Sequence, residues 1–474
     1  MKIVKTAKLK ILSHTKSFEP TIKIYNKALS FYIEVVQKEW EVVKDLEPKE
    51  QLRLLEKLTH KTKKRKTVQY DFDKEFYKFP SYLRRACIME AIGYYKSYDT
   101  HYKKWLKERE KKLSKGKKFY KKPPTLNLKP NSFPVFYHKE MFKHLSRGTA
   151  QIKLYIDNDW KWMDITYSTK NLYSSNEYRF LGYKEQSPKL VKKGKKYFLN
   201  IPYKTNVKLN STPIKKQIAV GVDLGLTKSA VVSAITSNGT VIARKFINQP
   251  IEKDRLQKKL NRLAKAKRKS GLIKAPSYWR KINNLQKAIA QKTADEIIKF
   301  ALKHNASVIV LERLKNFKPP KHFYGARLLR AKLQYWAKRK IQNIVFLKAH
   351  GFGLRVRFVN PKGTSQYAFD GSGKVKRNGK KDICTFTNGK IYHADLNASY
   401  NIASRYFIQE YLKPLSEMAK LQVEAKVPLL AKRASYSLAS LIRLAKALEE
   451  FPPEALLSRM QVKEAPAITE GLAG

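Results

Sequence analysis

The stretch Ile218-Ala219-Val220-Gly221-Val222-Asp223-Leu224-Gly225 constrains the fold more than any other part of this sequence. Its first five residues are apolar or small, a pattern typical of a strand that is buried on both faces. Asp223 then places a carboxylate where the strand ends, and a buried carboxylate is costly unless a partner compensates it. Because an aspartate in this position is more often a helix cap or a turn residue, its meaning depends on the elements that come after it.

The segments after Asp223 alternate between strand and helix patterns. Asn238-Gly239 separates two β-type runs and is a strong hairpin signal. The later elements that we expect are a strand pair over 230–235 and 241–247, helices over 253–270, 279–305 and 328–350, and strands over 307–311 and 354–359. Glu312 directly follows the first of these later strands. A strand ending in Asp, a two-strand meander, a helix and a strand ending in Glu follow one another in the order of an RNase H-type α/β fold.

A third acid, Asp395, lies in His393-Ala394-Asp395-Leu396-Asn397-Ala398-Ser399, which has the pattern of a helix start. Three carboxylates in one pocket repel one another, and a divalent cation is the usual relief. Hard oxygen ligands favour Mg²⁺ or Mn²⁺ over softer metals. Two such ions ~4 Å apart would activate an attacking water and stabilise the leaving 3′ oxygen of a phosphodiester. We therefore expect Asp223, Glu312 and Asp395 to be metal ligands and catalytic residues of a nuclease.

The charge of the chain points to a polyanionic partner. The 474 residues carry a formal net charge of +62, yet 42% are hydrophobic and 12% aromatic, which indicates a folded protein and not a basic tail. Because phosphate contacts by Lys and Arg release counterions, we favour nucleic acid over a merely soluble surface. No stretch is apolar for about 20 residues, which argues against a membrane partner. Cys87 and Cys384 are the only cysteines, which excludes a disulfide framework and fits a reducing cytoplasm.

The N-terminal half and the C-terminal end differ from this α/β part in their sequence patterns. Residues 1–15 alternate like a strand, 16–131 contain two long helical patterns, and 132–212 contain short β-type runs that predict a small β-barrel. Residues 408–474 have nearly balanced charges and Leu/Ala-rich helical stretches. We expect this near-neutral C-terminal tail to lie outside the basic, nucleic-acid-binding part.

Three segments resemble a known family. Residues 221–225 resemble the first RuvC motif of the TnpB proteins, the RNA-guided nucleases that transposons encode, while 310–314 and 393–402 resemble the second and third motifs. The acids of these motifs are about 90 and then about 80 residues apart, as an RNase H-type core with its helices requires. The compact type V CRISPR effectors share this core, so a transposon context and a CRISPR context both stay open.

The resemblance also implies a multidomain architecture. In the family, a helical recognition domain is inserted into a wedge β-barrel, and an RNase H-like RuvC nuclease domain comes after them. On this chain the wedge would comprise residues 1–15 and 132–212, the recognition domain residues 16–131, and the nuclease domain residues 213–407.

One segment departs from the family. Residues 360–367 resemble the lead into the family's zinc ribbon, in which two Cys-x-x-Cys pairs hold Zn²⁺. The four ligand positions are occupied here by Ala368, Gly371, Cys384 and Thr387, so three thiolates are missing. We therefore expect no zinc, and we expect a metal-free hairpin or flexible loop within a degenerate zinc-ribbon insertion over 364–392. The basic run 374–381 in it either touches nucleic acid or is simply solvated.

The resemblance implies a magnesium-dependent, RNA-guided DNA endonuclease. A guide RNA would pair with double-stranded target DNA, and single-stranded DNA would reach the RuvC site. A cytoplasmic, nucleoid-associated protein of a prokaryote is implied as well. Three other classes stay open: a nuclease-silent RNA-guided DNA-binding protein, a transposase, and a structural RNA-binding protein. The first usually lacks an acid of the triad, the second usually orders its acids Asp, Asp, Glu, and the third explains the charge but not the acids.

Overall fold

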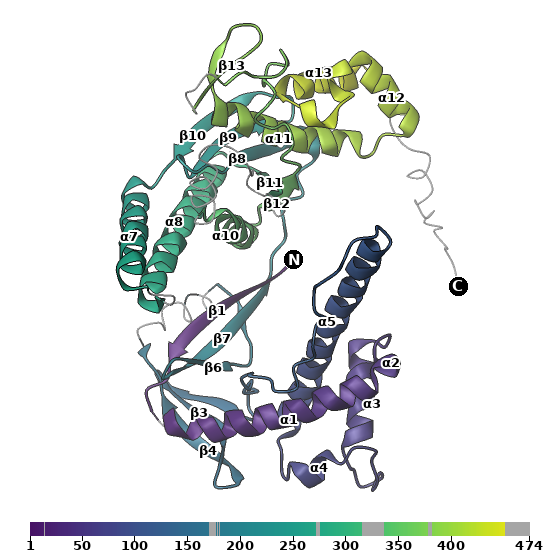
Figure 1. Ribbon diagram of the computed structural model, residues 1–474, viewed down its shortest axis with the longest axis vertical. Coiled ribbons are helices and arrows are strands. Elements are labelled where there is room, and N and C mark those ends of the chain that lie inside the picture. Colours follow the sequence, from purple (N-terminus) through teal and green to yellow (C-terminus); the bar gives the residue numbers. More distant parts are fainter. Residues whose placement is uncertain are drawn as a thin grey trace, which may run out of the picture. The chain divides into compact units, whose positions relative to one another are not determined.

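A computed structural model describes residues 1–13, 15–169, 177, 179, 181–271, 275–314, 336–377 and 382–450 (Figure 1). The chain divides into two compact units, one of Lys2–Asn206 and one of Met1 with Val207–Gly474. Among the helices within the described ranges, none combines the length and the apolar character that a membrane span requires.

The first unit contains two antiparallel sheets. Its strands are β1 (Lys2–Lys10), β2 (Phe142–Ser146), β3 (Thr149–Ile156), β4 (Asp159–Thr166), β5 (Lys184–Glu185), β6 (Lys189–Lys193) and β7 (Lys196–Asn206). β7 pairs with β1 along the whole of β1 and also pairs with β5 and β6, while β2, β3 and β4 form the second sheet in that order. The start of the chain and the end of this unit therefore share one sheet. The assignment of these sheets to a wedge barrel stays a prediction.

Helices fill the sequence between β1 and β2. They are η1 (Thr15–Ser17), α1 (Phe18–Lys38), α2 (Trp40–Val43), α3 (Pro48–Thr59), α4 (Phe72–Glu75) and α5 (Ser81–Leu113). In α1, Ile22, Tyr25, Leu29 and Tyr32 recur at three- and four-residue spacing and are buried. This stripe packs against α5, and the same core includes residues of both sheets.

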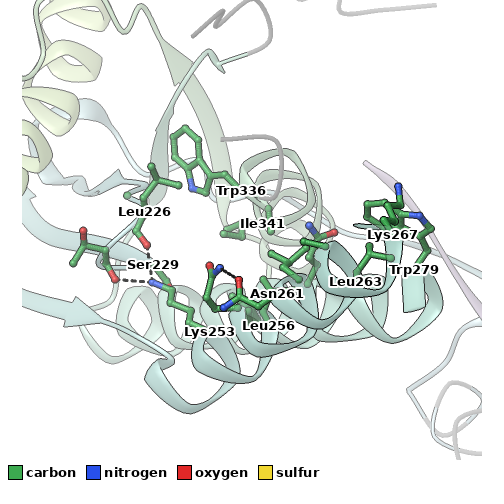
Figure 2. Close-up of a pocket in the computed structure, with 18 residues that line it drawn as sticks. Leu226, Ser229, Lys253, Leu256, Asn261, Leu263, Lys267, Trp279, Trp336 and Ile341 are labelled. Carbon is green, nitrogen blue, oxygen red and sulfur yellow. Dashed lines mark hydrogen bonds between the residues drawn. The ribbon is translucent and has the colours of Figure 1, made fainter. Parts of the chain in front are cut away.

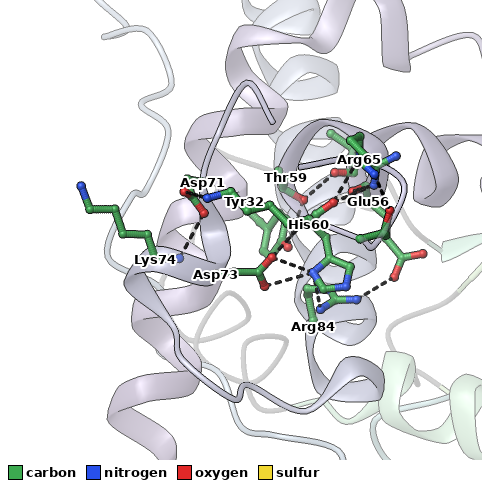
Figure 3. Close-up of polar contacts among 12 residues, drawn as sticks. Tyr32, Glu56, Thr59, His60, Arg65, Asp71, Asp73, Lys74 and Arg84 are labelled. Atoms are coloured by element: carbon green, nitrogen blue, oxygen red, sulfur yellow. Dashed lines mark hydrogen bonds and ion pairs between the residues drawn. The ribbon is translucent and has the colours of Figure 1, made fainter. Parts of the chain in front are cut away.

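A cluster of ionic and polar contacts ties the chain between α3 and α4 to α5 (Figure 3). The Asp73 carboxylate accepts hydrogen bonds from His60 Nδ1 at 2.8 Å and from the Lys61 amide at 2.9 Å. Arg84 of α5 forms an ion pair with Glu56 of α3 at 3.5 Å, and its side chain is 7% exposed. The recognition role predicted for residues 16–131 is not tested by these contacts, which show only how the helices are joined.

The second unit is built on a five-stranded mixed sheet. Its strands are β8 (Ile218–Asp223), β9 (Ala230–Thr236), β10 (Val241–Ile247), β11 (Val308–Glu312) and β12 (Arg355–Val359). The order across the sheet is β10-β9-β8-β11-β12; β8, β9 and β10 form an antiparallel meander, and β11 is parallel to β8 and β12. The meander and the parallel strands have the order that the sequence predicts for the α/β part.

Helices cover both faces of this sheet (Figure 1). They are η3 (Ile214–Lys216), α7 (Pro250–Ser270), α8 (Pro276–Lys303), α10 (Lys338–Gly351), α11 (Ala394–Leu412), α12 (Glu417–Lys426), η5 (Pro428–Leu430), η6 (Arg433–Ser435) and α13 (Leu438–Glu449). Val220 and Val222 belong to one core with α8 and α10, whereas Ala219 belongs to another core with α11 and α13. Successive side chains of a strand point to opposite faces of the sheet, so a strand that is buried on both faces contributes to two cores. Of the predicted helix over 328–350, residues 328–335 lie outside the described part.

The expectation for the C-terminal segment is wrong in two respects. The predicted boundary at residue 408 falls inside α11, which ends at Leu412. Beyond it, Val423, Leu441 and Leu444 are fully buried in the core that also contains residues of β8 and α11. The physical reason is that these helices are amphipathic, so a balanced overall charge does not stop one face from joining the core. Residues 451–474 lie outside the described part of the chain.

The expected degenerate zinc-ribbon segment contains a hairpin of β13 (Ile383–Thr385) and β14 (Ile391–His393). Ala368, Cys384 and Phe386 are buried in a small apolar core with Ala394. Of the basic run 374–381, residues 378–381 lie outside the described part. The absence of zinc stays a prediction.

Candidate active site

Two of the three predicted acids end neighbouring parallel strands. Asp223 is the last residue of β8 and Glu312 the last residue of β11. The strand register pairs Val222 with Leu311, so the next residue of each strand lies at the same edge of the sheet. Carboxyl ends of parallel strands meet in this way in open α/β sheets, where ligand sites usually form.

The third acid reaches the same edge from a helix. Asp395 is in the first turn of α11, and its backbone amide donates a hydrogen bond to Nδ1 of the cap residue His393 at 3.2 Å. A β-carbon placed on Gly225, two residues after Asp223, would lie 3.9 Å from Asp395 Oδ2. The structure therefore brings the Asp395 carboxylate next to the chain that leaves β8.

Burial has the largest effect on the pKa of each of the three acids, and it favours their uncharged forms. Burial raises the pKa of Asp223 well above its ordinary value, and the charges of Glu312 and Asp395 raise it further, while Arg377 acts in the opposite direction. Burial also raises the pKa of Glu312 and of Asp395. All three residues are nevertheless partly exposed. An added cation can therefore reach them, and it would relieve their repulsion.

The donor chemistry fits a hard divalent cation, whereas the spacing is not that of a closed metal site. Carboxylate oxygens are the ligands that Mg²⁺ and Mn²⁺ prefer. Yet nowhere in the described ranges do three or more His, Cys, Asp or Glu side chains lie close enough together to hold a metal ion. The role of Asp223, Glu312 and Asp395 as metal ligands stays a prediction.

Glu312 has contacts that the sequence does not reveal. The hydroxyl of Thr364 donates a hydrogen bond to Glu312 Oε1 at 2.5 Å, and Gln342 of α10 donates to the backbone carbonyl of Glu312 at 2.7 Å. In the sequence, Thr364 stands out only as part of the segment that leads into the degenerate ribbon. Its contact with Glu312 spans 52 residues, and nothing local in the sequence signals it.

A cavity of about 720 Å³ opens beside the loop after Asp223, between that loop and helices α7, α8 and α10 (Figure 2). Lys253 of α7 donates hydrogen bonds to the carbonyls of Leu226 and Thr227 at 3.1 and 2.6 Å and to Asn248 Oδ1 at 2.9 Å. Burial, together with the nearby charge of Lys228, lowers the pKa of Lys253 to about 8. Lys253 thus fastens the loop next to the acids, a second contact that the sequence does not indicate.

Known proteins that resemble this chain carry TnpB-like names. Residues 5–156 match the Aq_aa04 family. The TnpB-like protein aq_aa05 of Aquifex aeolicus (strain VF5) is 28% identical over 244 residues, which are 46% of this chain and 78% of that protein. The TnpB-like protein ORF457 of Acidianus two-tailed virus is 33% identical over 84 residues, which are 17% of this chain and 18% of that protein.

A solved structure of the mini-RNA-guided endonuclease CRISPR-Cas_phi3 has a similar fold. It matches with a TM-score of 0.51 and 12% identity over 85% of this chain and 92% of that chain. At this identity the likeness concerns the fold alone. In sequence the chain is similar to TnpB-like proteins, which agrees with the resemblance of its three motifs.

Proposed function

We propose that this chain is an RNA-guided DNA endonuclease whose RuvC-like site consists of Asp223, Glu312 and Asp395. The observation that supports the proposal is the position of the three acids: Asp223 and Glu312 end neighbouring parallel strands at one edge of the sheet, and Asp395 lies beside the loop that leaves β8. The net charge of +62 and the names of the similar proteins support nucleic acid as the partner. Guide RNA and target DNA, in double- and single-stranded form, would be bound by this charge.

In this proposal the acids hold the metal and the neighbouring residues hold the acids. Mg²⁺ or Mn²⁺, when bound, supplies an activated water and charge stabilisation at the leaving oxygen. Asp223 and Glu312 approach from the sheet, and Asp395 approaches from the start of α11. Because the three do not stand at metal-binding distance, their side chains would move toward a bound ion. Thr364, Lys253 and His393 limit how far the surrounding chain can shift with them.

The test uses the full chain purified with its copurifying RNA, whose sequence identifies the guide. We compare the parent with Asp223→Asn and, as a control, with Asp254→Asn, which removes an exposed acid on α7. We expect Asp223→Asn to abolish DNA cleavage in Mg²⁺ and in Mn²⁺ while RNA and target-DNA binding persist. Asp254→Asn should cleave as the parent does.

A second readout is the stability of the metal-free protein. The pKa of Asp223 is higher in the folded protein than in the unfolded chain. The charged Asp223 carboxylate therefore opposes folding once the pH exceeds the pKa that Asp223 has in the unfolded chain. Asp223→Asn should therefore raise the thermal stability at neutral pH, and the gain should fade as the pH falls and the parent takes up a proton. Normal cleavage by Asp223→Asn would refute the site, and a parent that binds DNA without cutting it in either metal would favour the nuclease-silent alternative.

A further inference from the structure

A hydrogen bond from the buried Thr364 hydroxyl restricts the orientation of the Glu312 carboxylate. The Thr364 side chain is buried, with 2% of the residue exposed. Its hydroxyl lies 2.5 Å from Glu312 Oε1 and 3.0 Å from the Pro361 carbonyl. One hydroxyl proton can serve only one of these acceptors. An ionised carboxylate is the stronger acceptor, so Thr364 donates to Glu312 whenever Glu312 is charged.

The loop that carries Thr364 is fastened in turn by α11. Asn401 donates hydrogen bonds to the carbonyls of Thr364 at 3.0 Å and Tyr367 at 2.8 Å. One turn further along the helix, Arg405 Nη1 donates to the carbonyls of Asn360 at 2.7 Å and Lys362 at 2.8 Å. Residues four apart lie on one face of a helix, so this face of α11 binds both ends of the loop.

The same two side chains also bind the C-terminal segment. Arg405 donates from Nε to the Tyr436 carbonyl at 3.2 Å and from Nη2 to the Ala434 carbonyl at 2.5 Å. The amide of Leu438 donates to Asn401 Oδ1 at 3.3 Å. Arg405 is only 2% exposed, and burial lowers its pKa to about 10, so it stays charged at neutral pH. A buried cation that satisfies four carbonyls from two segments fixes those segments relative to each other.

We propose that Thr364 and Arg405 are positioning residues of the nuclease site. Thr364 orients the Glu312 carboxylate, and Arg405 holds the Thr364 loop against the C-terminal segment 434–449. The inference rests on the proposed function, because it assumes that Glu312 binds a divalent cation. It adds that residues 434–449 are part of the scaffold of the site. Groups that hydrogen-bond to a metal ligand commonly change metal affinity by about 10- to 100-fold when removed.

The first experiment isolates the hydroxyl of Thr364. Thr364→Val removes the hydroxyl at nearly constant side-chain volume, and Thr364→Ser keeps the hydroxyl. Thr293→Val is the matched control, because Thr293 is a buried threonine of α8 in the same unit. Mn²⁺ binding to the RNA-loaded full chain is measured by isothermal titration calorimetry, and cleavage is measured over a range of Mn²⁺ concentrations. We expect Thr364→Val to bind Mn²⁺ about 10- to 100-fold more weakly and to recover cleavage at saturating Mn²⁺. The other two variants should stay within about threefold of the parent, well below that range.

The second experiment asks whether Arg405 acts through Thr364. Arg405→Lys keeps the charge but not the planar fork, and it is combined with Thr364→Val in a double-mutant cycle on the Mn²⁺ dissociation constant. Since both residues act on the same carboxylate, their effects should not add. Thermal unfolding of each variant identifies any that fails to fold, and the Thr364 pair decides the question without Arg405.

The outcomes separate this inference from the function on which it rests. If Asp223→Asn loses Mn²⁺ binding but Thr364→Val binds Mn²⁺ and cleaves like the parent, the positioning role is refuted and the proposed function stands. If Asp223→Asn binds Mn²⁺ as the parent does, the metal site is wrong and both proposals fall. A Thr364→Ser variant as impaired as Thr364→Val would also overturn the role of the hydroxyl.

Discussion

Gly221→Ala should damage both the fold of the second unit and its proposed active site. Gly221 lies in β8 two residues before Asp223, and α11, which carries Asp395, crosses directly over it. A β-carbon at this position would lie 2.2 Å from the Ser399 carbonyl oxygen and 2.9 Å from both Cβ and N of Ala403. Since real contacts of this kind stay above 3.0 Å, strand and helix must separate by about 1 Å, and a close-packed interior transmits such a shift.

The expected size of the effect can be worked out from this displacement. Overpacking of this kind costs about 1–3 kcal/mol, and a shift of about 1 Å between reacting groups can slow a reaction about 100-fold. Unfolding and single-turnover DNA cleavage are measured on the same preparations. Gly351→Ala is the control, because a β-carbon at Gly351 meets nothing within 4 Å. Parent-like stability and rate in Gly221→Ala would show that α11 does not lie against β8 as described.

Three further predictions concern two other charged groups, Glu185 and Lys253. Burial raises the pKa of Glu185, but hydrogen bonds from His144 and Arg179 outweigh it and lower that pKa to about 2. Glu185→Gln should therefore reduce the free energy of unfolding by about 3 kcal/mol at pH 7. The loss should shrink as the pH falls below about 4.5, because the parent carboxylate then takes up a proton. Thermal unfolding of both proteins at pH 7 and at pH 3.5 measures this difference. Lys253→Met should slow cleavage about tenfold without weakening DNA binding, because it frees the loop after Asp223. The parent should also slow above about pH 8, where Lys253 loses one of three donors, whereas the rate of Lys253→Met should not respond there.

The sheet of the second unit could be predicted closely from local patterns. The expected strand over 241–247 matches β10, and the apolar run that ends in Asp223 matches β8. Buried strands leave continuous apolar runs, and Asn238-Gly239 marks the turn between β9 and β10. These sequence signals are local, so they predict the strands without knowledge of the residues that each strand contacts.

The supports of the site could not be predicted in this way. Arg405 lies in α11, where every residue from Leu396 to Ile408 is buried, so no polar and apolar faces in the sequence indicate which carbonyls its side chain meets. Its partners Asn360 and Ala434 are 45 and 29 residues away. The expectation for the C-terminal segment is wrong for a related reason. Its balanced charge reflects the residues on its surface, whereas its buried leucines determine which core it joins. Charge composition alone is therefore a poor guide to domain boundaries.

The predicted ribbon segment, which has only one of the family's four thiolates, is held beside the proposed active site by contacts of other kinds. In a zinc ribbon the metal ties two turns together. Here the thiol position Cys384 and the alanine at 368 are buried together, and the Thr387 hydroxyl donates to the Ser372 carbonyl across the same gap. β14 of this hairpin ends at His393, which caps α11 directly before Asp395. Because apolar burial and hydrogen bonds hold the hairpin, the start of α11 remains anchored, and the acid it carries keeps its place beside β8.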